Sequence, residues 1–161
     1  MRSMQKQSKI YLRTIALITI VLAGLYSCKK HKSKTQKEED EKIIKQYIAD
    51  HNLSATATGT GLYYVITSQG TGTQPTISST VTVAYRGYLT NGNSFDQSGA
   101  SGATFPLQSV IKGWQEGIPL YKKGGKGILL IPSELGYGSK TQNKIPANSV
   151  LIFDVELLNV Q

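Results

Sequence analysis

Tyr85, Phe95 and Asp96 are the side chains best placed to act together on a ligand. A phenol and a carboxylate held against an aromatic ring make a plausible site for a neutral, partly apolar molecule. The alternative is a β-hairpin that packs its aromatic residues into an ordinary core. The only two histidines, His31 and His51, precede the part of the chain with this pattern, so histidine acid–base or metal chemistry is excluded there.

The stretch that carries these three residues has the pattern of a hairpin. Over residues 81–86 apolar and polar side chains alternate, so Val81, Val83 and Tyr85 should share one face of a half-buried strand. Asn91-Gly92 follows, which is a strong hairpin signal and predicts a type I′ turn with φ > 0 at both central residues. The returning chain then brings the phenylalanine and the aspartate back towards the tyrosine.

Composition places the chain among folded globular proteins. It has 161 residues, of which 39% are hydrophobic and 17% charged, enough for one ordinary domain with appendages. The formal charge of +8 is concentrated near the start, because the first 27 residues contain four basic and no acidic residues. From residue 80 onward there are 7 basic and 5 acidic residues, which is not the charge excess of a nucleic-acid-binding protein.

The first 27 residues are predicted to be a signal peptide. The basic residues precede an apolar run of 11 residues, Ile15 to Leu25, shorter than the ~18–20 residues that span a bilayer. A short transmembrane anchor or a buried helix is the alternative. The run ends in Leu25-Tyr26-Ser27-Cys28, which resembles the lipobox of bacterial lipoproteins. That resemblance implies a lipid on Cys28, the only cysteine, and attachment to a membrane in the bacterial cell envelope, facing the periplasm or the exterior.

Two further segments are expected before the main domain. Residues 28–37 are polar and basic and are predicted to form a tether, and residues 38–61 to form a helix followed by a flexible link over Ser54–Gly61. Within the helix an apolar stripe of Ile44, Tyr47 and Ile48 recurs at spacings of three and four. Residues 38–51 could therefore be a solvated spacer helix, a docking helix, or the interface of a homodimer.

Residues 62–161 are predicted to form the main domain. A first strand is expected at Leu62–Ile66, a small-residue loop at Gln97–Thr104, an edge strand around Pro106, a central strand at Ile128–Ile131 and a last strand at Val150–Leu158. Ser109 is a fair N-cap for a helix of about two turns that carries Trp114, the only tryptophan, and that Gly113 and Gly117 keep short. Such a helix is most economically placed across a sheet.

The motifs of this domain run in one order over about 80 residues and together form a specific signal. They are Val81-Thr-Val-Ala-Tyr85-Arg-Gly, Gly92-x-x-Phe95-Asp96, Phe105, Val110-Ile111-x-Gly113-Trp114-x-Glu116-Gly117, Gly124 with Lys126, Ile131-Pro132, Tyr137-Gly138, Ile145-Pro146 and Phe153-Asp154-Val155-Glu156-Leu157. In these motifs the chain resembles the FKBP-type peptidyl-prolyl cis-trans isomerases, with core motifs in residues 80–161. The resemblance implies an α+β fold in which a twisted antiparallel sheet wraps around one short helix.

The resemblance also implies an enzyme without a cofactor or metal, acting on proline-containing polypeptides, with macrolides as possible ligands. It assigns catalytic roles to Tyr85, Phe95, Asp96 and Tyr137, and substrate contacts to Phe105, Val110, Ile111, Trp114, Ile145 and Phe153. In this assignment Trp114 forms the pocket floor, while the Tyr137 hydroxyl and the Ile111 N–H donate to ligand carbonyls. Ordinary core packing is the alternative for each of these residues.

This sequence departs from the family pattern at the rim of the expected pocket. The loop between Tyr137 and Ile145 is about one residue shorter and more polar than usual, with Lys144 where an apolar residue is common. We expect such changes to affect substrate preference and macrolide affinity more than the reaction itself. The alternative function is a non-catalytic FKBP-like chaperone or a module that binds proline-containing segments. A purely structural lipoprotein is a third possibility.

Overall fold

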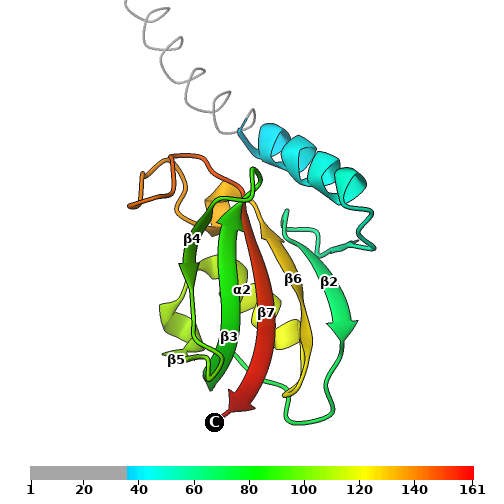
Figure 1. Ribbon diagram of the computed structural model, residues 1–161, viewed down its shortest axis with the longest axis vertical. Coiled ribbons are helices and arrows are strands. Elements are labelled where there is room, and N and C mark those ends of the chain that lie inside the picture. Colours follow the sequence, from blue (N-terminus) through cyan, green and yellow to red (C-terminus); the bar gives the residue numbers. More distant parts are fainter. Residues whose placement is uncertain (1–35) are drawn as a thin grey trace, which may run out of the picture. The chain divides into compact units, whose positions relative to one another are not determined.

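The computed structural model describes residues 36–161, and residues 37–161 form one compact unit. After a helix over residues 36–50 come β1 (Thr56–Ala57), β2 (Tyr63–Ser68), β3 (Thr80–Leu89), β4 (Ser94–Gln97), β5 (Ala103–Pro106), the 3₁₀ turn η1 (Leu107–Ser109), α2 (Lys112–Gly117), η2 (Ile118–Leu120), β6 (Lys126–Ile131), η3 (Ser133–Leu135) and β7 (Leu151–Val160). The strands form one antiparallel sheet in the order β1-β2-β6-β7-β3-β4, and β5 also pairs with β3 (Figure 1). The predicted α+β architecture is confirmed.

The two faces of the sheet are covered by different helices. Along β6, side chains alternate between the faces, so Leu129 and Ile131 belong to the main core together with Trp114 of α2. Leu130, which points the other way, packs with Ile44 of the helix at 36–50. Figure 1 shows α2 behind the sheet. One central strand therefore contributes to two separate apolar clusters.

The helix at 36–50 forms as its sequence predicts, and its apolar stripe has a partner within the chain. Ile44 is fully buried, and Tyr47 and Ile48 pack against the same cluster. Asn52 ends the helix in a left-handed conformation (φ 50°), while Leu53 N–H bonds to Ile48 O at 3.0 Å, which is a Schellman ending. The homodimer through residues 38–51 stays a prediction, and the stripe that suggested it lies against the chain's own sheet.

Three local predictions were wrong. Only Gly92 of the Asn91-Gly92 pair has a positive φ (84°), and Leu89 and Asn93 bond across a three-residue loop, so the turn is not type I′. Ser109 is not the cap of α2, because it ends the preceding 3₁₀ turn and Ile111 takes the N-cap position without a side-chain bond.

The third wrong prediction is the flexible link at Ser54–Gly61. Part of this segment is β1, which pairs with Tyr63 and Tyr64 of β2. A segment rich in Thr, Ala and Gly carries little strand signal of its own. Pairing with the sheet edge supplies the structure that the local sequence does not specify.

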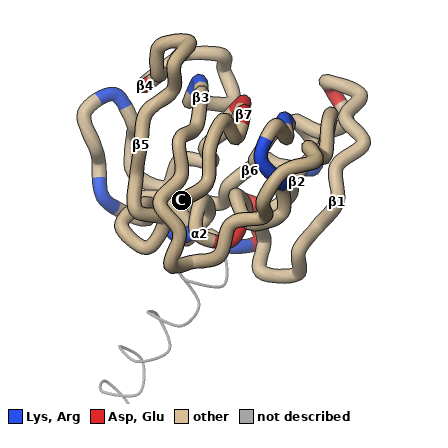
Figure 2. Tube along the Cα trace, turned by 90° about the horizontal axis from the view of Figure 1, so that it is seen from below, with Lys and Arg blue, Asp and Glu red and all other residues tan. Residues whose placement is uncertain are grey.

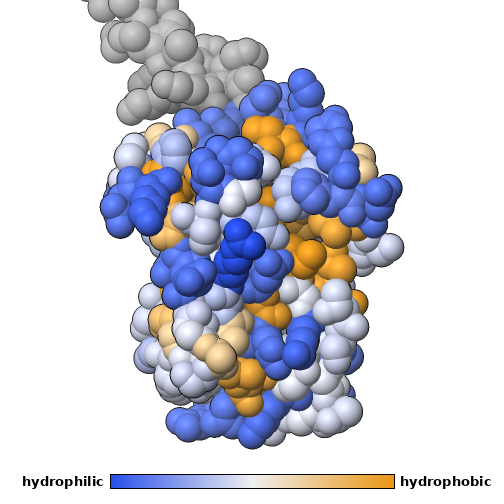
Figure 3. Space-filling model, viewed as in Figure 1, coloured by the Kyte–Doolittle hydropathy of each residue, from blue (hydrophilic) through white to orange (hydrophobic). Residues whose placement is uncertain are grey.

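Charge on the described part of the chain is balanced. Residues 36–161 contain ten basic and ten acidic residues, which are distributed over several elements (Figure 2). On the face seen in Figure 3, apolar residues form small patches separated by polar ones. Across residues 36–161 no helix has both the length and the apolar character that a membrane crossing requires. The predicted signal peptide, Cys28 and most of the tether lie outside the described residues.

Gly113 allows α2 to lie close to β6, so a side chain at this position should lower the stability of the fold. A Cβ at Gly113 would clash with Ile131, a stiff and fully buried side chain. Alanine favours a helix over glycine by ~1 kcal/mol, but overpacking a core costs ~1–3 kcal/mol. We expect Gly113→Ala to lower the free energy of unfolding in urea by about 1 kcal/mol.

Gly99→Ala is the matched control for this measurement. A Cβ at Gly99 would have no neighbour within 4 Å, so the same substitution should cause no loss of stability there. A Gly113→Ala protein as stable as the wild type would contradict the close approach of α2 to the sheet.

Candidate active site

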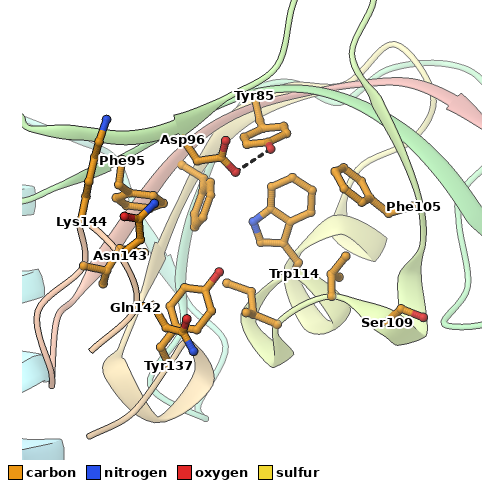
Figure 4. Close-up of a pocket in the computed structure, with 14 residues that line it drawn as sticks. Tyr85, Phe95, Asp96, Phe105, Ser109, Trp114, Tyr137, Gln142, Asn143 and Lys144 are labelled. Atoms are coloured by element: carbon orange, nitrogen blue, oxygen red, sulfur yellow. Dashed lines mark hydrogen bonds between the residues drawn. The ribbon is translucent and has the colours of Figure 1, made fainter. Parts of the chain in front are cut away.

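A cavity of about 540 Å³ opens between the sheet, α2 and the loop before β7 (Figure 4). The structure brings together all of the pocket residues expected from the sequence: Tyr85, Phe95, Asp96, Phe105, Val110, Ile111, Trp114, Tyr137, Ile145 and Phe153. They come from β3, β4, β5, β7, α2 and two connecting segments. Residues up to 68 positions apart in sequence therefore share one cavity.

Trp114 is the centre of the aromatic lining. Its ring meets Tyr85, Phe105 and Phe153 edge to face, with centroid distances of 5.1, 5.8 and 5.3 Å. Phe95 joins this group through Phe153 at 5.5 Å. Edge-to-face contacts of this kind are worth ~0.5–1.5 kcal/mol each beyond the burial of area. The cavity is therefore walled by rings that hold one another in place.

Tyr85 and Asp96 form the polar part of the wall. The Tyr85 hydroxyl donates to Asp96 Oδ2 at 2.8 Å. Antiparallel pairing of β3 with β4 places the two residues near each other, and Ser98 Oγ accepts the Tyr85 N–H at 2.9 Å. The pKa of Tyr85 is raised to about 12, mainly because the phenol is partly buried and to a smaller extent because it donates to the Asp96 carboxylate. The phenol is thus a stable donor to Asp96 at neutral pH.

The segment between Tyr137 and Ile145 forms the opposite rim. Gln142 and Ile145 exchange backbone bonds of 2.9 and 2.7 Å around Asn143 and Lys144. Asn143 is left-handed (φ 48°), a conformation that asparagine tolerates in tight turns. Figure 4 shows the Tyr137 side chain at this rim with its hydroxyl directed into the cavity.

Four lining residues were not predicted as site residues: Ser109, Gln142, Asn143 and Lys144. The loop between Tyr137 and Ile145 was expected to be polar, but none of these four residues was predicted to contact a ligand. Asn143 and the nearby Pro146 are residue types that favour a turn, which is the one sequence signal for this rim. Ser98, which fixes the backbone of Tyr85, lay in a small-residue stretch with no recognisable motif.

Within residues 36–161, Trp114 carries the one buried side-chain nitrogen or oxygen that has no hydrogen-bond partner. Its Nε1 is buried and has no hydrogen-bond partner there, although the side chain is only 4% exposed. A buried donor without an acceptor is uncommon, and an acceptor on a bound ligand would satisfy it. The described residues include no cluster of three or more His, Cys, Asp or Glu side chains that could bind a metal ion. The cavity wall consists of aromatic and aliphatic side chains with a few hydrogen-bonding groups among them.

The sequence model of the FKBP-type peptidyl-prolyl cis-trans isomerase family matches residues 71–158. A probable FKBP-type peptidyl-prolyl cis-trans isomerase FkpA from Neisseria meningitidis is 45% identical over 136 residues, covering 81% of this chain and 49% of the relative. FkpA of Escherichia coli K12 is 44% identical over 127 residues, covering 78% and 45%. The chain spans about half the length of these two relatives.

Solved structures agree with the sequence comparison. The crystal structure of FkpA from Escherichia coli superposes with a TM-score of 0.69 at 37% identity, covering 89% of this chain and 71% of that chain. A peptidyl-prolyl cis-trans isomerase from Pseudomonas syringae gives a TM-score of 0.67 at 31% identity, covering 77% and 95%. Both sets of relatives point to one family.

The raised pKa of Tyr85 generates a prediction about pH. Because the folded-state pKa is about 12 and the unfolded value is ~10, the phenol stabilises the fold below pH ~10 and loses this contribution as the pH rises to about 12. Absorbance titration of tyrosinate, taken as the difference between wild type and Tyr85→Phe, should show this late ionisation. Asp96→Asn should move it towards pH ~10 without reaching it, since burial remains. A Tyr85 that titrates near pH ~10 in the wild type would contradict both the burial of the phenol and its hydrogen bond to Asp96.

Proposed function

The chain belongs to the FKBP-type peptidyl-prolyl cis-trans isomerase family, and on that premise we propose that it rotates Xaa-Pro amide bonds in proline-containing polypeptides. The observation that carries the proposal is the ring-walled cavity with Tyr85 and Asp96 on one side and Tyr137 on the other. Its volume is within the range of pockets that take small ligands, so it can accommodate a prolyl ring with its neighbouring amide.

The reaction suits a site with no nucleophile. Rotation about an Xaa-Pro amide faces a barrier of ~18–20 kcal/mol, set by resonance across the C–N bond, and no bond is broken. The planar amide is the more charge-separated form, whereas the twisted amide is less polar. A cavity walled by Trp114, Phe105 and Phe153 stabilises the twisted form relative to the planar one, and each ~1.4 kcal/mol gained in this way gives about tenfold in rate.

Donors around the cavity hold the polypeptide in place. The Tyr137 hydroxyl and the Ile111 N–H are proposed to donate to carbonyls on either side of the prolyl bond. Trp114 Nε1, the buried donor without a partner in the described chain, provides a third position for an acceptor. Asp96 orients the Tyr85 phenol through their 2.8 Å bond and sets the local field, and it does not need to carry a proton. Such positioning restricts the substrate to a turn in which rotation is easier.

The polar rim bears on which ligands bind best. Gln142, Asn143 and Lys144 line the cavity where an apolar rim would favour large hydrophobic ligands. We propose that macrolides enter the same cavity with reduced affinity, because their apolar surface meets these polar side chains. We therefore propose that short polypeptide segments, and not macrolides, are the ligands that this cavity binds best.

We further propose that the protein acts in the bacterial cell envelope on exported proteins whose folding waits on slow prolyl bonds. The lipobox-like Leu25-Tyr26-Ser27-Cys28 supports attachment through a lipid on Cys28. Acyl chains contribute ~0.8 kcal/mol per buried CH₂, so the thioether-linked lipid would hold the protein at a membrane surface.

Isomerisation of a Xaa-Pro peptide in a protease-coupled assay tests the function. We expect Phe95→Ala and Asp96→Ala each to lower kcat/KM by about tenfold, since one removes part of the wall and the other the partner of Tyr85. Ile77→Ala and Asp50→Ala alter exposed residues that do not line the cavity and should leave kcat/KM unchanged. Activity equal to the wild type in both site variants would refute the assignment. A protein that binds the peptide without turnover would instead be a proline-segment binding module.

Labelling with radioactive palmitate tests the anchor. The wild-type chain should incorporate label and fractionate with membranes, whereas Cys28→Ala should do neither, because no other cysteine can take the lipid. Cys28→Ala that is still labelled, or a wild type that is unlabelled and freely soluble after processing, would overturn the proposed anchor.

A further inference from the structure

A buried carboxylate joins the helix at 36–50 to the loop that carries Tyr137. Asp40 is fully buried, and its Oδ2 accepts both the N–H and the hydroxyl of Ser133, at 2.8 and 2.6 Å. These two residues are 93 positions apart in sequence. Hydrogen bonds to a carboxylate are shorter and about twice as strong as neutral ones, and a buried carboxylate is retained only where such partners satisfy it. The contact is therefore a specific attachment between the helix and the loop.

Ser133 in turn closes the loop around Tyr137. Its carbonyl accepts the N–H of Gly136 at 3.0 Å and the N–H of Gly138 at 2.8 Å. Tyr137 lies between these two donors, so its backbone is clamped on both sides by one acceptor. Gly138 O then accepts the N–H of Asn148 at 2.8 Å, which connects the loop to the segment entering β7. Ser133 thus uses its N–H and hydroxyl to bind Asp40 and its carbonyl to close the turn around Tyr137.

The attachment comes from outside the part of the chain that defines the family. The family model matches residues 71–158, which include Ser133 and Tyr137 but not Asp40. Ile44, one helical turn beyond Asp40, is fully buried against Leu130 of β6, so the helix cannot move away without uncovering an apolar cluster. The position of Asp40 is therefore set by packing that is independent of the cavity.

We propose that Asp40 is a positioning residue for the isomerase reaction, which holds Tyr137 in place through Ser133. The inference rests on the proposed function for its kinetic consequence, although the attachment itself does not. With the carboxylate present, the loop presents the Tyr137 hydroxyl to the cavity in one arrangement. Without it, the two donors of Ser133 lose a buried acceptor and the turn that clamps Tyr137 loosens.

Hydrogen–deuterium exchange in the full chain tests the attachment without any activity measurement. Asp40→Ala should raise deuterium uptake in a peptide covering residues 133–138, where the amides of Gly136 and Gly138 are bonded to Ser133. Uptake in β7 should stay as in the wild type. Glu39→Ala, which removes an exposed acid from the adjacent position, should change neither. Unchanged uptake at 133–138, or an equal rise in β7, would overturn the proposal.

Kinetics test the consequence for catalysis. We expect Asp40→Ala to lower kcat/KM for a Xaa-Pro peptide about fivefold, and Asp40→Asn, whose amide oxygen can still accept from Ser133, to restore most of it. In a Tyr137→Ala background the same Asp40→Ala change should cost less than about twofold, because the side chain that it positions is gone. Equal losses in both backgrounds would show a general structural role and reject the proposal.

Two further results separate the possible failures. Should Asp40→Ala fail to fold, Ser133→Ala removes only the hydroxyl bond and should change exchange and kcat/KM in the same direction to a smaller extent. Its failure to do so would count against the proposal. A wild-type chain that does not isomerise the peptide would refute the proposed function, while the exchange measurement would still decide whether Asp40 holds the loop.

Discussion

The edge-to-face packing of Trp114 against Tyr85, Phe105 and Phe153 is the interaction on which the site depends. These rings come from a helix and three different strands, so their contacts fix how α2 lies against the sheet. A cavity with walls made in this way is shaped by packing, and a change in the placement of any one of these elements would alter it. Within this aromatic wall only a few polar side chains line the cavity, among them Asp96 and Tyr137.

The same sheet also explains why a helix outside the family domain can influence the site. β6 directs Leu129 and Ile131 towards α2 and Leu130 towards the helix at 36–50. The helices on the two faces of the sheet therefore pack against the same strand. The chain leaves β6 directly into Pro132 and Ser133, the residue that Asp40 binds. The loop bearing Tyr137 therefore begins where the two packed layers meet. This arrangement places the Asp40–Ser133 hydrogen bonds next to the polar rim of the cavity.

Much of the fold could be predicted because it depends on local periodicity and on side-chain chemistry. Alternation identified β3, an apolar run identified β6, and Trp114 between two glycines indicated a short helix that lies across a sheet. Predictions failed where a local signal was weak or had several solutions. Thr56–Ala57 becomes a strand only by pairing with β2, and the Asn91-Gly92 signal does not distinguish a two-residue from a three-residue loop. Ser109 has a side chain suited to an N-cap, but it ends the 3₁₀ turn η1, and α2 begins only after Ile111.

Residue types, their order and their spacing along the chain were enough to predict the family, the antiparallel domain and the aromatic residue set of the cavity. The polar residues of the rim, the hydrogen bond from Tyr85 to Asp96 and the packing of the helix stripe on the chain's own sheet became clear only from the three-dimensional structure. It also brought Asp40 to Ser133 across 93 positions. Contacts of that kind follow from how packed layers meet, and no periodicity along the chain records where two such layers will touch.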